Sequence, residues 1–95
     1  MAENQTVCKT LTIGSPQGLH ARPAAQVVHI AGRFQSKLKL RRVGDHGEAD
    51  CRSVLAMLML AATKDTVLEL CATGSDAAEA AEAVADYFQR NFDEA

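Results

Sequence analysis

The chain has 95 residues, of which 47% are hydrophobic and 23% charged, and its formal net charge is −2. This length predicts a single domain spanning residues 1–95, too small to enclose a large substrate cavity, so we expect its function to lie on a surface. The mildly acidic balance, with one Tyr, three Phe and no Trp, argues against nucleic acid as a partner, which would need a basic face and stacking aromatics.

The N-terminal residues 1–6 are polar and lack the apolar core of a signal peptide. No apolar run approaches the roughly 20 residues of a membrane-spanning helix, so we expect no direct membrane insertion. The three cysteines, Cys8, Cys51 and Cys71, are odd in number and form no CxxC pair, which is typical of free thiols in a reducing compartment. These features predict a cytoplasmic protein.

The first half of the chain predicts a strand followed by a helix. Alternating residues over 7–13 indicate a strand, and the glycine- and proline-containing turn 14–18 ends it. A helix is expected after His20, with Pro23 in its first turn and Gly32 as its stop. Its apolar face is formed by residues at helical spacing: Ala24, Val27, Val28 and Ala31.

A second strand is predicted over 34–40, where apolar and polar residues alternate, and a loop over 43–47 separates it from a short strand at 48–51. Ser53 is a good N-cap for a helix over 54–62 that is apolar almost all round.

A last strand is expected over 66–72 and a final helix from Gly74-Ser75 to about Asn91. The buried stripe of this helix consists of Ala77, Ala81, Val84 and Phe88. The order β-α-β-β-α-β-α predicts one antiparallel sheet with helices on one face.

The segment from Gly18 to Ala25 carries the chemistry. His20 falls at the N-cap of the first helix, where free amides and the helix dipole form an anion site, and Arg22 adds donors suited to phosphate. This positive environment favours a neutral imidazole, which is a nucleophile able to accept a phosphoryl group. Taken singly, a histidine that only caps a helix and an arginine that is only solvated remain the commoner interpretations.

The eight residues 18–25 read Gly-Leu-His-Ala-Arg-Pro-Ala-Ala and resemble the active-site signature of HPr, the histidine-containing phosphocarrier of the bacterial phosphotransferase system. The resemblance implies an α+β fold, an open-faced β-sandwich whose four-stranded antiparallel sheet is covered on one face by three helices. It implies phosphorylation of His20 through Nδ1, with Ala21 and Arg22 at the phosphate-binding helix N-terminus. The donor would be enzyme I (phosphoenolpyruvate-protein phosphotransferase) and the acceptor an EIIA domain. The chain would be a monomeric carrier without a cofactor, and not an enzyme.

Ser53 and the run that follows it resemble the second site of the same family, a serine phosphorylated by HPr kinase/phosphorylase. A phosphate there would gain from the helix N-terminus while adding about −1.5 to −2 charge to a docking surface. The alternative is a plain N-cap hydroxyl, worth about 1 kcal/mol. An exposed apolar patch usually marks a protein contact, and the candidate partner-binding residues, any of which could instead be core, are Ala25, His29, Val54, Leu55 and Leu58.

Residues 53–60 and 91–94 look closer to the nitrogen-related branch of the family, called NPr. An alternative function is therefore a mainly regulatory module that controls a partner protein according to its phosphorylation state. His29 and His46 lack companion ligands, so no metal site is expected, and Cys51 lacks a base partner. A ferredoxin-like RNA-binding or metallochaperone module also fits the element order, but the chain lacks the stacking aromatics and the CxxC such modules would show.

Overall fold

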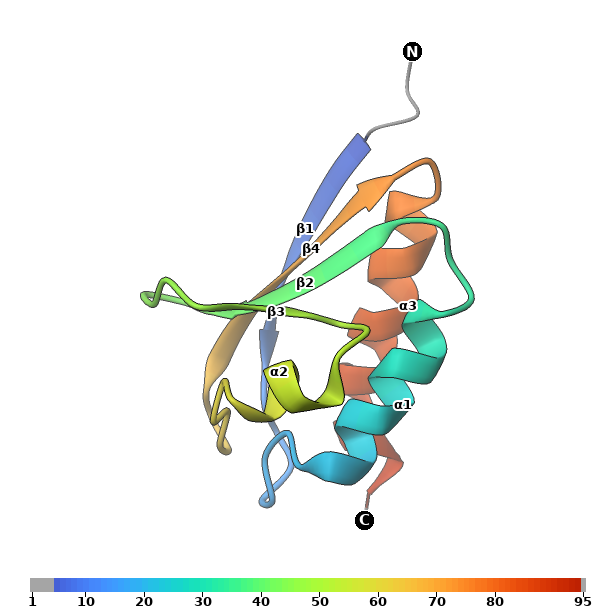
Figure 1. Ribbon diagram of the computed structural model, residues 1–95. Helices are drawn as coiled ribbons and strands as arrows, with labels where there is room; N and C mark the ends of the chain where they lie inside the picture. The colour runs from blue at the N-terminus through green and yellow to red at the C-terminus, as the bar shows by residue number, and fades with distance from the viewer. Residues whose placement is uncertain (1–4, 95) are drawn as a thin grey trace.

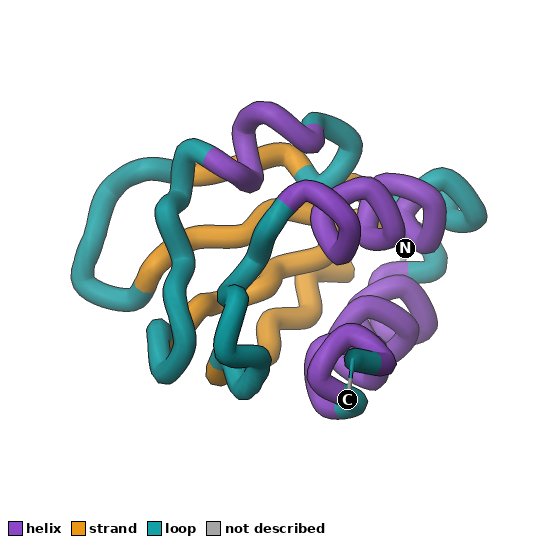
Figure 2. The backbone as a smooth tube through the Cα atoms, turned by 90° about the horizontal axis from the view of Figure 1, so that it is seen from below, coloured by secondary structure: helices purple, strands orange, loops and turns teal. Residues whose placement is uncertain are grey.

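The computed structural model describes residues 5–94 and contains four strands, three α-helices and one 3-10 turn. These elements are, in chain order, β1 (Gln5–Thr12), α1 (Ala21–Ala31), β2 (Lys37–Arg42), β3 (Glu48–Asp50), α2 (Val54–Leu58), β4 (Val67–Gly74), α3 (Ala77–Gln89) and η1 (Asn91–Asp93). Figure 1 shows the helices on one face of the sheet, and Figure 2 shows the same two layers from below. The predicted open-faced sandwich is confirmed.

The sheet is antiparallel throughout, and its strand order is β1-β4-β2-β3. The last strand in sequence is thus central and pairs with β1 on one side and β2 on the other. This arrangement brings the loop that follows β1 beside the loop that precedes β4. Ile13 N–H donates to the carbonyl of Thr66, and Asp65 N–H donates to the carbonyl of Ile13, at 3.0 and 2.7 Å.

The core lies between the sheet and the helices, because every second strand residue points toward the helical layer. The stripe expected on the final helix is buried at all four positions: Ala77, Ala81, Val84 and Phe88. Helix α3 packs mainly over β1 and β4. The buried inward residues of the two central strands, β4 and β2, are Leu38, Leu40, Leu68, Leu70 and Ala72. The opposite face of the sheet carries no helix and leaves alternate side chains of β1 exposed, among them Cys8 and Thr10.

Strand β2 begins at Lys37, so the strand expected from residue 34 is wrong in its first three residues. Asp76, at the start of α3, accepts hydrogen bonds from the backbone amides of Gln35 and Ser36 at 2.9 Å, and one from the Ser36 hydroxyl at 2.6 Å. A distant carboxylate therefore holds this segment as a loop.

The prediction that Ser53 is the N-cap of α2 is confirmed, because its side chain accepts the amide of Ala56.

Helix α2 ends at Leu58, four residues earlier than expected. Ala61 lies in the left-handed region, with φ of 52°, and the carbonyl of Leu60 accepts a hydrogen bond from Arg42 Nη1 at 3.2 Å. Two residues further on, the carbonyl of Ala62 accepts the amide of Leu19 at 2.9 Å. The residues after α2 therefore hydrogen-bond to the loop that precedes α1 and do not continue the helix.

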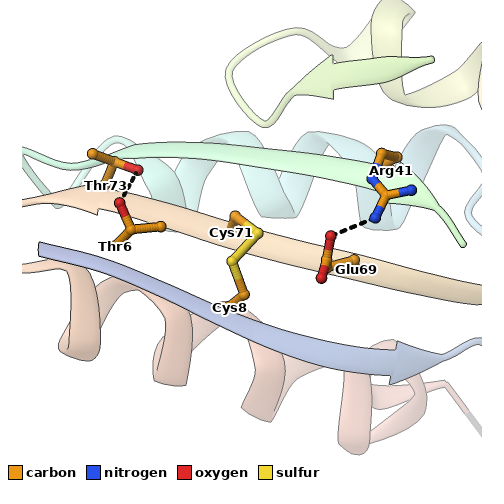
Figure 3. Close-up of a disulfide and its surroundings, with 6 residues drawn as sticks. All are labelled: Thr6, Cys8, Arg41, Glu69, Cys71 and Thr73. Carbon is orange, nitrogen blue, oxygen red and sulfur yellow. Dashed lines mark hydrogen bonds and ion pairs between the residues drawn. A yellow bond between two sulfur atoms is a disulfide. The ribbon is translucent and has the colours of Figure 1, made fainter. Parts of the chain in front are cut away.

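The prediction of free thiols is wrong for two of the three cysteines. Cys8 and Cys71 form a disulfide between β1 and β4, which Figure 3 shows, while Cys51 is free and buried. Burial raises the pKa of the Cys51 thiol to about 12, so this group is an inert thiol. Between residues 5 and 94, no helix has the length and apolar character that crossing a membrane requires.

Candidate functional site

His20 is the N-cap residue of α1, as the sequence predicted. Its backbone is extended, with φ −87° and ψ −173°, and its carbonyl accepts the amide of Ala24 at 3.1 Å. The amides of Ala21 and Arg22 belong to the first turn and have no acceptor within the helix, while Pro23 has no N–H to satisfy. The imidazole is half-buried at a helix N-terminus with two amides available to an anion.

The loop before His20 is held closely against the segment before β4. Gly18 has φ of +69°, and a Cβ at this residue would lie 2.4 Å from the carbonyl oxygen of Ala62. The next residue, Leu19, is buried and donates its amide to the same carbonyl. The positive φ and the close approach to Ala62 both need glycine at residue 18. Together with the hydrogen bond of Leu19, they fix the position of His20 at the start of α1.

A carboxylate from the other end of the chain binds the histidine ring. Glu94 Oε2 lies 2.7 Å from His20 Nε2, and Glu94 Oε1 accepts a hydrogen bond from the buried Ser15 hydroxyl at 2.7 Å. The hydrogen bond from Ser15, and after it the one from His20, holds the pKa of Glu94 below its usual range. A proton on Nε2 satisfies this contact and leaves Nδ1 with its lone pair.

Glu94 reaches the ring through a left-handed turn. Asn91, Phe92 and Asp93 all have positive φ, between 54° and 60°, a conformation that costs energy in residues other than glycine. The turn is held because the Phe92 ring packs against Phe88, with ring centroids 4.9 Å apart. Gly14 leaves room for the Asn91 side chain, whose Oδ1 lies 2.2 Å from where a Cβ would stand.

The ring faces an open cleft of about 780 Å³ between the loop after β1, the start of α1 and the C-terminal turn. Arg22 lines this cleft and is exposed. Its guanidinium makes no hydrogen bond or ion pair with any other residue between 5 and 94, so its donors remain available. The cleft is lined by Ser15, Pro16, Gln17, His20, Arg22, Gln26, Tyr87, Phe92, Asp93 and Glu94.

His20 and Arg22, which the sequence singled out, line the same cleft, whereas the sequence did not point to Ser15 or Glu94. No local pattern could reveal Glu94, because it lies 74 positions after His20 and the contact depends on the C-terminal turn. Ser15 was assigned only to a turn, although its hydroxyl is buried and oriented toward the same carboxylate.

Ser53 caps α2 and stands apart from the cleft, which it does not line. Its Oγ accepts the amide of Ala56 at 3.1 Å, and its side chain is half-buried. The neighbouring Arg52 donates to the carbonyl of Phe34 at 3.0 Å and so ties the start of α2 to the chain that follows α1.

The structure leaves part of the expected apolar patch in solvent. Leu55 is 69% exposed and Leu58 36%, and Met59, which the sequence did not single out, is 77% exposed. Val54 is half-buried, and Ala25 and His29 are exposed on α1, which packs beside α2. Met57, on the opposite side of α2, is completely buried in the core. An exposed apolar surface of this kind is typical of a protein contact.

The chain resembles known phosphocarriers over nearly its whole length. Residues 7–90 match the family model described as "PTS HPr component phosphorylation site". The phosphocarrier protein HPr of Treponema pallidum is 38% identical over 93% of this chain and 98% of its own. The phosphocarrier protein NPr of Escherichia coli K12 is 40% identical over 94% and 98%. A crystal structure of HPr from Thermoanaerobacter tengcongensis superposes with a TM-score of 0.85 and 30% identity, covering 94% of this chain and 98% of that one.

Proposed function

Because the chain belongs to the HPr family of phosphocarrier proteins of the phosphotransferase system, we propose that His20 accepts a phosphoryl group from phosphorylated enzyme I and passes it to an EIIA-type acceptor. The observation that carries this proposal is the position of the His20 ring. It lies at the N-terminus of α1, faces an open cleft and has its Nε2 held by Glu94.

The contact with Glu94 selects the nucleophilic nitrogen. With the proton on Nε2, the lone pair of Nδ1 attacks the phosphorus of the donor phosphohistidine. One N–P bond forms as the donor N–P bond breaks, and the donor imidazole leaves with its electron pair. The onward transfer to the acceptor is the same exchange in the other direction. Such a reaction needs positioning and charge balance more than further catalytic groups.

The phosphoryl oxygens are then bound by the first turn of α1 and by Arg22. The amides of Ala21 and Arg22 donate to them, and the Arg22 guanidinium supplies a full positive charge. A single open cleft serves both donor and acceptor, since each partner must reach the same ring. We propose that the chain acts as a cytoplasmic monomer without a cofactor, a carrier and not an enzyme.

Ser53 is proposed as a regulatory site for HPr kinase/phosphorylase. Its Oγ stands at the start of α2, next to the exposed Leu55, so a phosphate there would place about −1.5 to −2 charge beside an apolar docking surface. A partner that meets this surface through apolar contacts would then bind less well.

A second candidate function is a regulatory module that binds a control protein according to its phosphorylation state. The identity to an NPr relative, 40%, lies between those to two HPr relatives, 38% and 41%, and this favours keeping the candidate. The two functions differ in outcome: a relay must surrender its phosphate to an EIIA acceptor, whereas the regulatory module need only change its affinity for a partner.

The proposal is tested by incubating the full chain with phosphoenolpyruvate and enzyme I and measuring its intact mass. We expect one acid-labile phosphate on the wild type, none on His20→Ala, and loss of the group when EIIA is added. Retention of the phosphate in the presence of EIIA would favour the regulatory module. Failure of the wild type to be phosphorylated would reject both functions.

The Ser53 site is tested separately with ATP and HPr kinase/phosphorylase. The wild type and His20→Ala should gain one acid-stable phosphate, and Ser53→Ala should gain none. If the wild type takes no acid-stable phosphate, regulation through Ser53 is excluded.

A further inference from the structure

The open face of the sheet carries a pair of sulfur atoms that the phosphocarrier chemistry does not use. Cys8 on β1 and Cys71 on β4 are direct cross-strand partners, with Cα atoms 4.1 Å apart, and their sulfurs are bonded. Both lie on the face away from the helices, and Cys8 is exposed. In Figure 3 the disulfide bridges the middle of the two strands, between the Thr6–Thr73 pair and the Arg41–Glu69 pair.

We propose that Cys8 and Cys71 are a reversible redox-modification site, a dithiol that a low-molecular-weight disulfide such as oxidised glutathione converts to the disulfide seen here. The inference rests on the proposed cytoplasmic location of the chain. Disulfides in that reducing compartment, when present, are usually transient, catalytic or redox-sensing. The third cysteine, Cys51, is buried and inert and offers no competing partner.

The surroundings of the pair suit a small anionic oxidant. A shallow cavity of about 320 Å³ opens beside Cys71 and is also lined by Lys37, Lys39, Glu48 and Thr73. Lys39 is the cross-strand neighbour of Cys71 on β2, so Cys71 has an ammonium-bearing residue on one side and Cys8 on the other. Lys39 pairs with Glu48 at 3.6 Å, and the nearby Glu69 carboxylate pairs with Arg41 at 2.6 Å. Lys37 forms no ion pair with the residues that the structure describes, so its ammonium can receive a carboxylate of glutathione.

The reaction balances in two exchanges. The thiolate of one cysteine attacks a sulfur of the oxidant, forms a mixed disulfide and releases one thiol of the oxidant. The thiolate of the other cysteine then attacks the first, closes the Cys8–Cys71 bond and releases the second thiol. Two cysteine thiols lose two protons and two electrons, and the oxidant disulfide is reduced to two thiols.

Oxidation needs no movement of the backbone, since the strand register already sets the two residues opposite each other. We therefore expect the hydrogen bonds between β1 and β4, and the segment from Ser15 to His20, to be kept when the bond is reduced. The modification should therefore act on the stability of the sheet and on its open face, and leave phosphate acceptance by His20 unchanged.

The purified full chain is equilibrated in a series of reduced-to-oxidised glutathione ratios, quenched in acid and unfolded. Its free thiols are then labelled with an alkylating agent, and the labels are counted by mass. We expect a change from three labels to one as the ratio becomes oxidising, and recovery of all three when the reductant is restored. Cys51→Ala, a matched control, should change from two labels to none. Cys8→Ser and Cys71→Ser should form no internal disulfide at any ratio.

Three outcomes would overturn the inference. These are a pair that stays reduced at every ratio, a disulfide that no ratio reduces, or a reduced chain that binds one Zn²⁺ and thereby resists oxidation. The last is a real competitor because Glu69 offers a carboxylate oxygen within 4.8 Å of both sulfurs. Peptide mapping of the wild type identifies the linked cysteines even if a variant fails to fold. No enzyme I or phosphoenolpyruvate is present, so failure here is distinguishable from failure of the phosphocarrier function.

Discussion

A carboxylate oxygen of Glu94 lies at hydrogen-bond distance, 2.7 Å, from Nε2 of His20, although the two residues are 74 positions apart in the chain. The other oxygen of the same carboxylate accepts the hydroxyl of Ser15, so both oxygens are engaged at one end of the cleft. This contact restrains the orientation of the ring and is satisfied by a proton on Nε2. We regard Glu94 as a positioning residue for His20.

Replacing Glu94 by Ala should slow phosphate acceptance by His20 about tenfold, because a hydrogen bond to a charged group is worth about 1.5 kcal/mol or more. Glu94→Gln should recover most of the rate, since an amide oxygen can still accept the Nε2 proton. The rate is measured with limiting enzyme I, and the tautomer of the ring by its nitrogen chemical shifts.

Glu82→Gln is a suitable control, because it makes the same change of charge on an exposed side chain of α3 that pairs with Lys9, away from the cleft. A wild-type rate and an unchanged tautomer in Glu94→Ala would show that the ring is oriented without the carboxylate.

Acid should destabilise the fold through Asp76. Hydrogen bonds from Ser36, and then from the amide of Gln35, hold the pKa of Asp76 below its usual value of 3.8. A carboxyl group whose pKa is lowered on folding stabilises the native state above the unfolded pKa, and that contribution is lost as the pH falls through the folded pKa. The free energy of unfolding should therefore decline below about pH 4.

Urea unfolding at a series of pH values measures this decline, and Asp76→Asn should make the curve flatter at its acidic end. Glu79, which lies one turn further along α3, supplies the control: Glu79→Gln should retain the wild-type slope. Equal slopes for the wild type and Asp76→Asn would assign the acid sensitivity to other groups.

The elements that could be predicted were those with a local cause. The stripe of α3 follows from side-chain spacing, and Ser53 caps α2 with its own hydroxyl, so both were recognised from the sequence. The start of β2 and the end of α2 were missed because distant groups decide them. Asp76 holds the chain before β2 in a loop, and Arg42 binds the carbonyl that follows α2.

The residues of the candidate site likewise fall into those with a local cause and those that depend on distant parts of the chain. His20 and Arg22 are two residues apart at a helix start, so their proximity could be inferred from the order of residues alone. The position of Glu94 depends on a left-handed turn near the chain end, and the Cys8–Cys71 bond depends on strand register. Neither leaves a pattern in nearby residues. Met59 was missed because it was assigned to a helix that in fact ends before it.

Gly18→Ala should destabilise the protein by about 2 kcal/mol or more, because it adds a Cβ in the left-handed region and against the carbonyl of Ala62. It should also slow phosphate acceptance, since Leu19 and His20 follow directly. Gly47→Ala is the matched control: a Cβ there meets no atom within 4 Å, and its stability should be unchanged. Denaturant unfolding of the two variants makes the comparison, and equal losses would contradict the proposed clash.

The Cys8–Cys71 disulfide should raise the free energy of unfolding by about 2–4 kcal/mol, because it closes a loop between cysteines 63 positions apart in the unfolded chain. Urea unfolding of the oxidised and the reduced wild type measures the difference. Cys8→Ser should match the reduced wild type in both oxidising and reducing buffer. An oxidised form no more stable than the reduced form would show that strain in the native state offsets the gain.

Leu55→Ser should weaken docking of enzyme I and of the EIIA acceptor by about fivefold or more, since truncating one of the few residues that dominate an interface costs more than about 1 kcal/mol. The fold should be unaffected because the side chain is 69% exposed. Val43→Ser removes an apolar side chain that is 55% exposed in the loop between β2 and β3, and it should leave binding unchanged. Calorimetric titration of each partner, alongside thermal unfolding, separates loss of contact from loss of structure. Equal affinities for wild type and Leu55→Ser would exclude Leu55 from the docking surface.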